Sequence, residues 1–165
     1  MTTTSTPALV GRFQPDARNF LARPVRTHGQ PTHTLVNLAL LYCWHSSGAP
    51  MVTNLLMARD WAEINVTAHP RPRDPRHEWV RGFGHGYRLG ADVGLVAGHV
   101  GEDQPWRRGE WAYLWEHEHG ALHVYLAARA RWHHLATVDF ELLRGMGRQC
   151  AEDIEMRTAW VEAVR

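Results

Sequence analysis

The chain has 165 residues, of which 44% are hydrophobic and 21% are charged, and its formal net charge at pH 7 is +1 with histidine neutral. The composition excludes an intrinsically disordered chain, and the small net charge excludes a protein that binds nucleic acid through its overall charge. The length predicts one domain with its own core. Neither a signal-peptide pattern nor an apolar stretch of membrane-spanning length is present, so we expect a cytoplasmic protein without membrane contact.

The first 32 residues are polar and contain four prolines. Such a segment is predicted to be an extended N-terminal arm outside the core (residues 1–32), followed by a helical domain over residues 33–165. The arm carries four arginines against a single aspartate, together with two phenylalanines, which suits contact with a partner. Its candidate interaction residues are Arg12, Phe13, Arg18, Phe20, Arg23 and Arg26.

Two helices and a basic loop are predicted next. The apolar run from His33 to about Ser46 favours a buried helix with Thr34 as its N-cap. A second helix is predicted over residues 50–65, because Pro50 is tolerated in a first helical turn. Residues 66–76 contain three prolines within six positions and predict a loop. Its candidate contacts to the phosphates of a nucleic acid are Arg71, Arg73 and Arg76.

Five glycines follow at four-residue spacing, at positions 82, 86, 90, 94 and 98. On a helix over about residues 78–101 they would form a groove without side chains beside an aromatic ridge, which suits close packing against the core or against a partner. The candidate interaction residues of this face are Phe83, Gly86, Tyr87, Gly90 and Gly94. The alternation of glycine with larger residues over 82–87 is the one strand-like pattern in the sequence.

The last third of the chain predicts two further helices, a long one over about residues 110–136 and a last one from Thr137 or Asp139 to the C-terminus. Together these elements predict an all-α single-domain bundle of about five helices, with the glycine-rich helix at its centre and the extended arm at its N-terminus. Cys43 and Cys150 lie in apolar and helical patterns, so two buried thiols are expected rather than a disulfide.

The sequence WEHEHGALH (residues 115–123) holds the densest group of metal-ligating side chains. On a helix, Glu116, His119 and His123 would share one face, and histidines four residues apart can bind one metal ion. The metalloprotease motif needs a glutamate directly after its first histidine, where this chain has Gly120, so that class is excluded. His45 is the candidate further ligand for zinc or another divalent metal. The alternative is that these histidines are ordinary surface residues.

From these features we predict a non-enzymatic interaction, assembly or regulatory accessory protein of bacterial or phage type, without a cofactor. It would bind a protein partner or itself through the arm and the glycine and aromatic face. The first alternative is a metal-dependent helical-bundle enzyme that uses the histidine cluster, and the second is a nucleic-acid-binding accessory protein. The chain has 18 arginines and no lysine, which indicates a GC-rich genome rather than selection for guanidinium chemistry.

Overall fold

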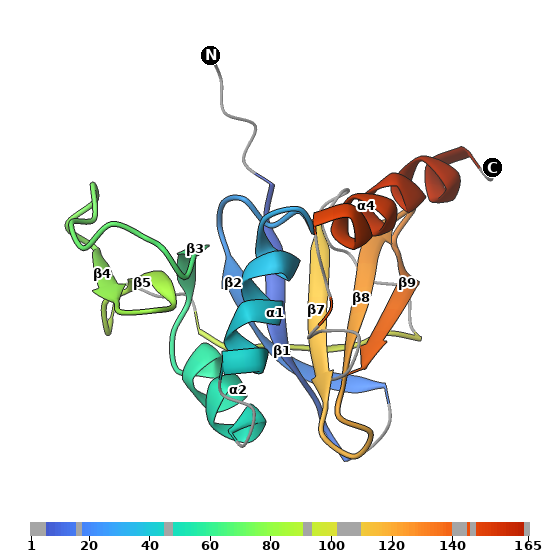
Figure 1. Cartoon of the computed structure of the whole chain (residues 1–165). Helices are drawn as coiled ribbons and strands as arrows, with labels where there is room; N and C mark the ends of the chain where they lie inside the picture. Colours follow the sequence, from blue (N-terminus) through green and yellow to red (C-terminus); the bar gives the residue numbers. More distant parts are fainter. Residues whose placement is uncertain are drawn as a thin grey trace.

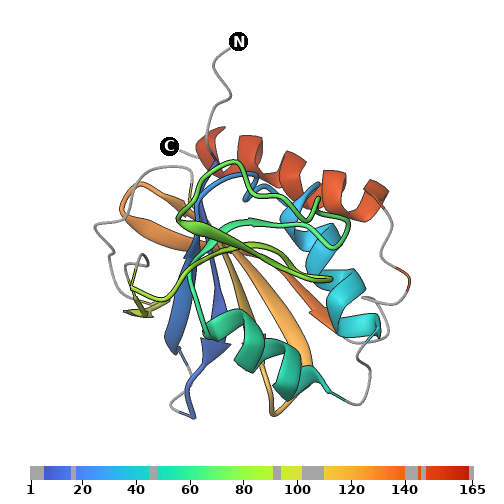
Figure 2. The same ribbon diagram turned by 90° about the vertical axis from the view of Figure 1, so that its left-hand side faces the viewer.

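The computed structural model describes residues 6–15, 18–44, 48–90, 94–101, 110–139, 145 and 148–163. Within these residues the chain forms one mixed sheet of nine strands, with three helices on one of its faces (Figures 1 and 2). The predicted all-α bundle of five helices is therefore wrong. No helix among the described residues combines the length and the apolar composition needed to cross a membrane.

The elements follow the chain in this order: β1 (Ala8–Phe13), β2 (Asn19–Val25), α1 (Thr34–Trp44), α2 (Ala49–Met57), β3 (Trp61–Ile64), β4 (His77–Val80), β5 (Gly84–Tyr87), β6 (Val96–His99), β7 (Trp111–Glu116), β8 (Ala121–Ala128), β9 (Arg131–Asp139) and α4 (Arg148–Ala163). The sheet order is β4-β5-β3-β2-β1-β7-β8-β9, and β6 pairs with β2 outside this path. The pairs β1–β7 and β2–β3 are parallel, and the other pairs are antiparallel.

The central strands are buried on both faces of the sheet. Trp111, Tyr113 and Trp115 of β7 face the main core, to which α1, α2 and α4 also contribute side chains. The alternate residues Ala112 and Leu114 belong to a second cluster on the opposite face. A strand covered on both faces has no polar alternation and reads as a continuous apolar run. Such a run also matches helical spacing, so the predicted helix over residues 110–136 is wrong, and these residues form most of the β7–β8–β9 meander.

The sequence contains few residues that are typical of the turns in this meander. The β8–β9 turn places Arg129 and Ala130 at φ of 53° and 60°, values usually supplied by asparagine or glycine in a two-residue hairpin turn. The β7–β8 turn ends at Gly120, which also has a positive φ of 59°. Neither glycine nor proline marks the first of these turns, so the pattern predicted an uninterrupted helix.

The expected N-terminal arm lies in the middle of the sheet. Residues 8–25 form the β1–β2 hairpin, and β1 lies between β2 and β7. Leu9 and Val10 are almost completely buried, on opposite faces. Pro24 is tolerated in β2 because it falls between the stretch that pairs with β6 and Val25, which pairs with β3. Residues 8–25 therefore contribute to the same core as the later part of the chain.

The glycine-rich segment is also not a helix, because it contains β4, β5 and β6. Gly84 has φ of 142°, and a Cβ atom there would lie 2.2 Å from the carbonyl oxygen of Glu63 on the neighbouring strand. A Cβ atom at Gly98 would lie 2.5 Å from the ring of Phe20. Of the five glycines spaced by four, Gly82, Gly90 and Gly94 have positive φ, and a Cβ atom at Gly86 or Gly98 would meet a nearby side chain. The strand-like alternation over residues 82–87 corresponds in part to β5, which spans Gly84–Tyr87.

Several helix predictions are confirmed in part. The first helix is α1, although Thr34 is its first residue and its hydroxyl donates to the carbonyl of His28 instead of capping the helix. The second helix ends at Met57, and β3 follows it. The last helix begins at Arg148 rather than near residue 139, because β9 extends to Asp139. No disulfide joins Cys43 and Cys150, but the expected burial of both thiols is wrong, because Cys43 is half-buried and Cys150 is exposed.

Candidate functional site

A pocket of about 770 Å³ lies at one end of the sheet, between the β1–β2 hairpin, the β7–β8 turn and α2. This end of the sheet is at the bottom of Figure 1, where the two hairpins extend beyond the rest of the strands. Apolar and aromatic groups form much of the pocket wall. Charged side chains come from β1, from the turn before β2 and from the end of β7. The lining residues include Arg12, Phe13, Arg18, Thr53, Trp115, Glu116, His123 and Tyr125.

Glu116 is the central acidic group of this site. It is the last residue of β7, and the β7–β8 register places His123 diagonally across from it on the same face of the sheet. One carboxylate oxygen lies 2.6 Å from Nε2 of His123, and the other lies 2.6 Å from Nδ1 of His119 in the turn. With the carboxylate ionised, both of these ring nitrogens donate to it.

The opposite nitrogen of His123 continues the network onto β9. Its Nδ1 lies 3.2 Å from the hydroxyl oxygen of Thr137 and 3.3 Å from Nε2 of His134. The Thr137 hydroxyl also lies 2.9 Å from Nε2 of His134. The cross-strand pairs of β8 and β9 explain the arrangement, because His123 is opposite Thr137 and Tyr125 is opposite His134. A chain of exchangeable protons thus runs from Glu116 across three strands.

Electrostatic interactions and burial shift the pKa values of these groups in different directions. Hydrogen bonding from His119 is the main cause that holds the pKa of Glu116 below its ordinary value, and the same contact raises the pKa of His119. Burial, helped by the nearby His123, lowers the pKa of His134. Near neutral pH the site therefore combines an ionised carboxylate with a neutral imidazole at the far end of the chain. Such a network can accept a proton at the pocket wall and pass it along the sheet.

Neither a protein-family model, nor a curated protein, nor a solved structure matches this chain. Its function therefore has to be inferred from the geometry of the site.

The pocket brings together two groups of residues that are distant in the sequence and were predicted to have different functions. Arg12, Phe13 and Arg18 were candidates for partner contact, whereas Glu116 and His123 were candidates for metal binding, and all five line the pocket. Glu116, His119 and His123 lie close together in the structure, although a hairpin and not a helix brings them together. The predicted further ligand, His45, lies outside the described residues.

The turn next to the pocket also offers a second set of possible metal ligands. Ligand atoms of Glu116, Glu118 and His119 all lie within 4.8 Å of one another. Two of these three residues are exposed, and the Glu116 carboxylate already accepts hydrogen bonds from two imidazoles. Metal binding in the turn stays a prediction.

The remaining candidates of the N-terminal segment have structural partners. Phe20 is buried against Trp132, with ring centroids 6.1 Å apart. Arg23 pairs with the buried carboxylate of Asp60 at 3.3 Å. The guanidinium of Arg26 lies 5.9 Å from the centre of the Tyr87 ring. These three side chains thus connect β2 and the residue after it to β9, to the residue before β3 and to β5.

The candidates in the glycine-rich segment and the basic loop are divided between the interior and the surface. Phe83 is buried in the main core, and Gly86 lies against the side chain of Arg59. Gly90 and Gly94 both have positive φ, at 88° and 104°. In the loop, Arg71 and Arg73 are exposed, and Arg76 forms an ion pair of 2.7 Å with Asp74. Nucleic-acid binding by these arginines stays a prediction.

Sequence reasoning missed four residues of the site: Trp115, Tyr125, His134 and Thr137. The signal that could have found His134 and Thr137 is the strand pairing, since the two-residue turn at 129–130 folds β9 back onto β8. A helical interpretation placed His134 several turns away from His123 and so separated groups that are 3.3 Å apart.

Proposed function

We propose that this protein binds a small acid with a ring-shaped apolar body in the pocket at the end of β1 and β7, and that Glu116 and His123 exchange a proton with it. The observation that carries this proposal is the joint presence of two arginines, an aromatic wall and a carboxylate–imidazole pair in one pocket. Its volume of about 770 Å³ falls in the usual range for small-molecule sites, which are mostly apolar with a few polar groups that orient the ligand.

The two arginines support recognition of an anionic group. The side chains of Arg12 and Arg18 are exposed at the pocket, and within the described part of the chain neither guanidinium forms an ion pair. Arginine presents several N–H groups in a planar fork, which suits a carboxylate or a phosphate. Among the described residues Glu116 forms no ion pair with either arginine, and its two carboxylate oxygens are hydrogen-bonded to the two imidazoles.

Trp115 supports the proposal from inside the pocket. Its side chain is buried and stacks on Tyr42 with ring centroids 4.5 Å apart, yet its indole N–H has no hydrogen-bond partner among the described residues. A buried donor without a partner costs about 1–3 kcal/mol. Trp115 is itself part of the pocket wall. An acceptor atom on a ligand that reaches its indole N–H would remove that cost.

The test uses 8-anilinonaphthalene-1-sulfonate, a fluorescent aromatic anion, as the probe. We expect saturable binding of one molecule by the intact chain, and the double substitution Arg12→Gln and Arg18→Gln should weaken it by about tenfold or more, because a charged hydrogen bond contributes about 1.5–3 kcal/mol. The matched control is Arg71→Gln with Arg73→Gln, which removes two exposed arginines outside the pocket. Equal weakening by both pairs, or no saturable binding, would refute the proposal.

Proton exchange is tested separately by calorimetry of the same probe in two buffers with different ionisation enthalpies. The heat should differ between the buffers for the natural chain and should become independent of the buffer for Glu116→Gln. If the natural chain shows no buffer dependence, the Glu116–His123 pair has no part in binding.

Self-association or partner binding is a second candidate, supported by exposed apolar side chains on the helices. Leu40 and Trp44 are exposed one turn apart on α1, and Met51 and Leu55 are exposed one turn apart on α2. Trp44 is 62% exposed, which is unusual for a side chain of this size. Light scattering of the natural chain and of Trp44→Ser tests this candidate: a dimer that dissociates on substitution supports it, and a monomer in both cases contradicts it.

A further inference from the structure

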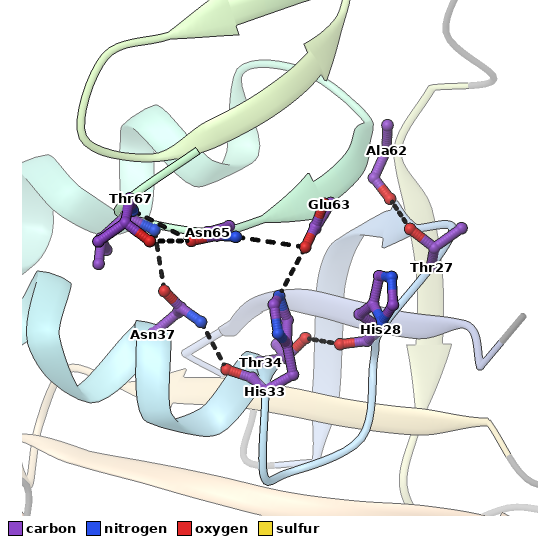
Figure 3. A network of polar contacts seen from close by, with 10 residues as sticks. Thr27, His28, His33, Thr34, Asn37, Ala62, Glu63, Asn65 and Thr67 are labelled. Atoms are coloured by element: carbon purple, nitrogen blue, oxygen red, sulfur yellow. Dashed lines mark hydrogen bonds and ion pairs between the residues drawn. The ribbon is translucent and has the colours of Figure 1, made fainter. Parts of the chain in front are cut away.

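A second group of titratable side chains lies away from the pocket, between the loop after β2, the start of α1 and β3. His28, His33 and Glu63 come from the loop after β2, from the residue before α1 and from β3 (Figure 3). His33 Nε2 lies 3.0 Å from a carboxylate oxygen of Glu63. The rings of His28 and His33 are tilted against each other with centroids 5.1 Å apart. Two imidazoles and one carboxylate therefore meet at one point of the fold.

The backbone around this group is fixed by hydrogen bonds. The loop after β2 is attached to β3 through Arg26 N to Trp61 O at 2.9 Å and Thr27 N to Ala62 O at 3.0 Å. The hydroxyl of Thr34 donates to the carbonyl of His28 at 2.6 Å, as Figure 3 shows. These bonds hold His28 in a left-handed conformation with φ of 55°. Non-glycine residues in that conformation are uncommon, and they occur preferentially at functional sites.

The contact between His33 and Glu63 has the distance of an ion pair. Nε2 of His33 is shielded from solvent, and it has no other partner among the described residues. Glu63 also accepts a long bond of 3.4 Å from the side-chain amide of Asn65. His33 is the main cause that keeps the pKa of Glu63 below its ordinary value, so the carboxylate is ionised at neutral pH.

A third imidazole lies on the neighbouring strand. The β3–β5 register places His85 directly opposite Glu63, and side chains of such a pair are on the same face of the sheet. Nδ1 of His85 is shielded from solvent and has no hydrogen-bond partner in the described part of the chain. The group thus contains two buried ring nitrogens, on His33 and His85, without a hydrogen-bond partner among the described residues; each can bind a metal ion once it carries no proton.

We propose that His28, His33 and Glu63 bind a divalent transition-metal ion, with His85 as the neighbour able to complete a set of four ligands. Imidazole and carboxylate are the ligands that zinc and related ions take in proteins, at about 2.0–2.2 Å from the metal. Ligand atoms around a tetrahedral ion of this size are about 3.3 Å apart, which is close to the present His33–Glu63 separation. The ligand atoms of His28, His33 and Glu63 do not all lie within 4.8 Å of one another. The exposed ring of His28 is the one that has to rotate toward the ion.

This site differs from the turn of β7 and β8 in its charge and in its rigidity. The turn offers two carboxylates and one histidine that are mostly exposed. The His28–His33–Glu63 group offers one carboxylate and up to three imidazoles, which favours a softer ion such as zinc or cobalt over magnesium or calcium. It is independent of the pocket, because none of its residues lines it.

The test is a titration of the full chain with Co²⁺, purified without a polyhistidine tag and freed of metal, followed by the visible absorption of bound cobalt. We expect one equivalent of Co²⁺ to bind and to be displaced by Zn²⁺. His33→Gln should weaken binding by more than about 100-fold, since changes even outside the ligand set cost 10- to 100-fold. The matched control is His119→Gln, which should leave the titration unchanged.

A second variant keeps the test decisive if His33→Gln does not fold. His28→Asn removes an imidazole at an exposed position, and asparagine tolerates the left-handed backbone found there. This variant should fold, as judged by circular dichroism, and should lose most of the cobalt absorption. The proposal is overturned if the natural chain binds no stoichiometric Co²⁺, if His28→Asn binds like the natural chain, or if His119→Gln alone abolishes binding.

Discussion

The ion pair between Arg23 and Asp60 offers the sharpest test of the fold, because it joins the N-terminal hairpin to the start of β3. Nη1 of Arg23 lies 3.3 Å from a carboxylate oxygen of Asp60, and Nε donates to the carbonyl of Met57 at 2.8 Å. The side chains are 13% and 1% exposed. The perturbation is Asp60→Leu, which removes the carboxylate and leaves the guanidinium partly buried beside an apolar group.

The expected loss in the free energy of unfolding is about 3–5 kcal/mol, the usual result of removing one partner from a buried pair. For a chain of this size such a loss corresponds to a fall of roughly 6–20 °C in Tm. The double substitution Arg23→Met and Asp60→Leu should recover most of it, because replacing both charges with apolar groups of similar size is often neutral. A free arm, as the sequence predicted, would make Arg23 irrelevant to stability.

The assay is urea unfolding followed by far-ultraviolet circular dichroism for the natural chain, both single variants and the double variant. The coupling between the two sites follows from this double-mutant cycle. If Asp60→Leu costs less than about 1 kcal/mol, or if the double variant is as unstable as the sum of the two single variants, then the pair does not hold the hairpin against β3.

Three further predictions concern packing, a buried hydroxyl and pH. Gly98→Val should lower the free energy of unfolding by about 1–3 kcal/mol in thermal unfolding, because the valine side chain would meet the ring of Phe20. An unchanged Tm would contradict the β2–β6 pairing. Tyr113→Phe should cost about 1–3 kcal/mol in urea unfolding, since it leaves a buried carbonyl of the loop after β2 without its 2.7 Å hydrogen bond, and a neutral result would argue against that contact. The pKa of Glu116 is lowered, so its contribution to stability is present above its ordinary pKa of 4.5 and is lost as the pH falls through the lowered pKa. The pKa of His119 is raised, so its contribution to stability is present below 6.5 and is lost as the pH rises through the raised pKa. Glu116→Gln should therefore move the His119 pKa, measured by NMR titration, down toward 6.5, and an unshifted titration curve would show that the two groups are not paired.

The sequence predicted the helices with clear signals at their starts. The apolar run after His33 became α1, and Pro50 lies in the first turn of α2 as expected. The proline-rich segment before β4 is a loop, also as predicted. The group formed by Glu116, His119 and His123 was found as well, because a spacing of three to seven residues brings side chains close in a tight hairpin as it does in a helix.

The strands could not be predicted because their burial depends on what lies on both faces of the sheet. Leu9 and Leu114 are covered on the side opposite the helices, so the polar alternation that would have marked β1 and β7 is missing. The prolines and arginines near the N-terminus suggested a solvated arm, whereas Arg23 is neutralised by Asp60 from a distant part of the chain.

Local patterns in the sequence account for the starts of α1 and α2, for the proline-rich loop before β4, and for which side chains have the chemistry of ligands and proton donors. Which of these side chains meet depends on the tertiary fold. Strand pairing places His134 beside His123 and β1 beside β7. The position of the residue before α1 relative to β3 places His33 beside Glu63. Such contacts arise from the burial of a whole sheet, a property that no single segment carries in its own pattern.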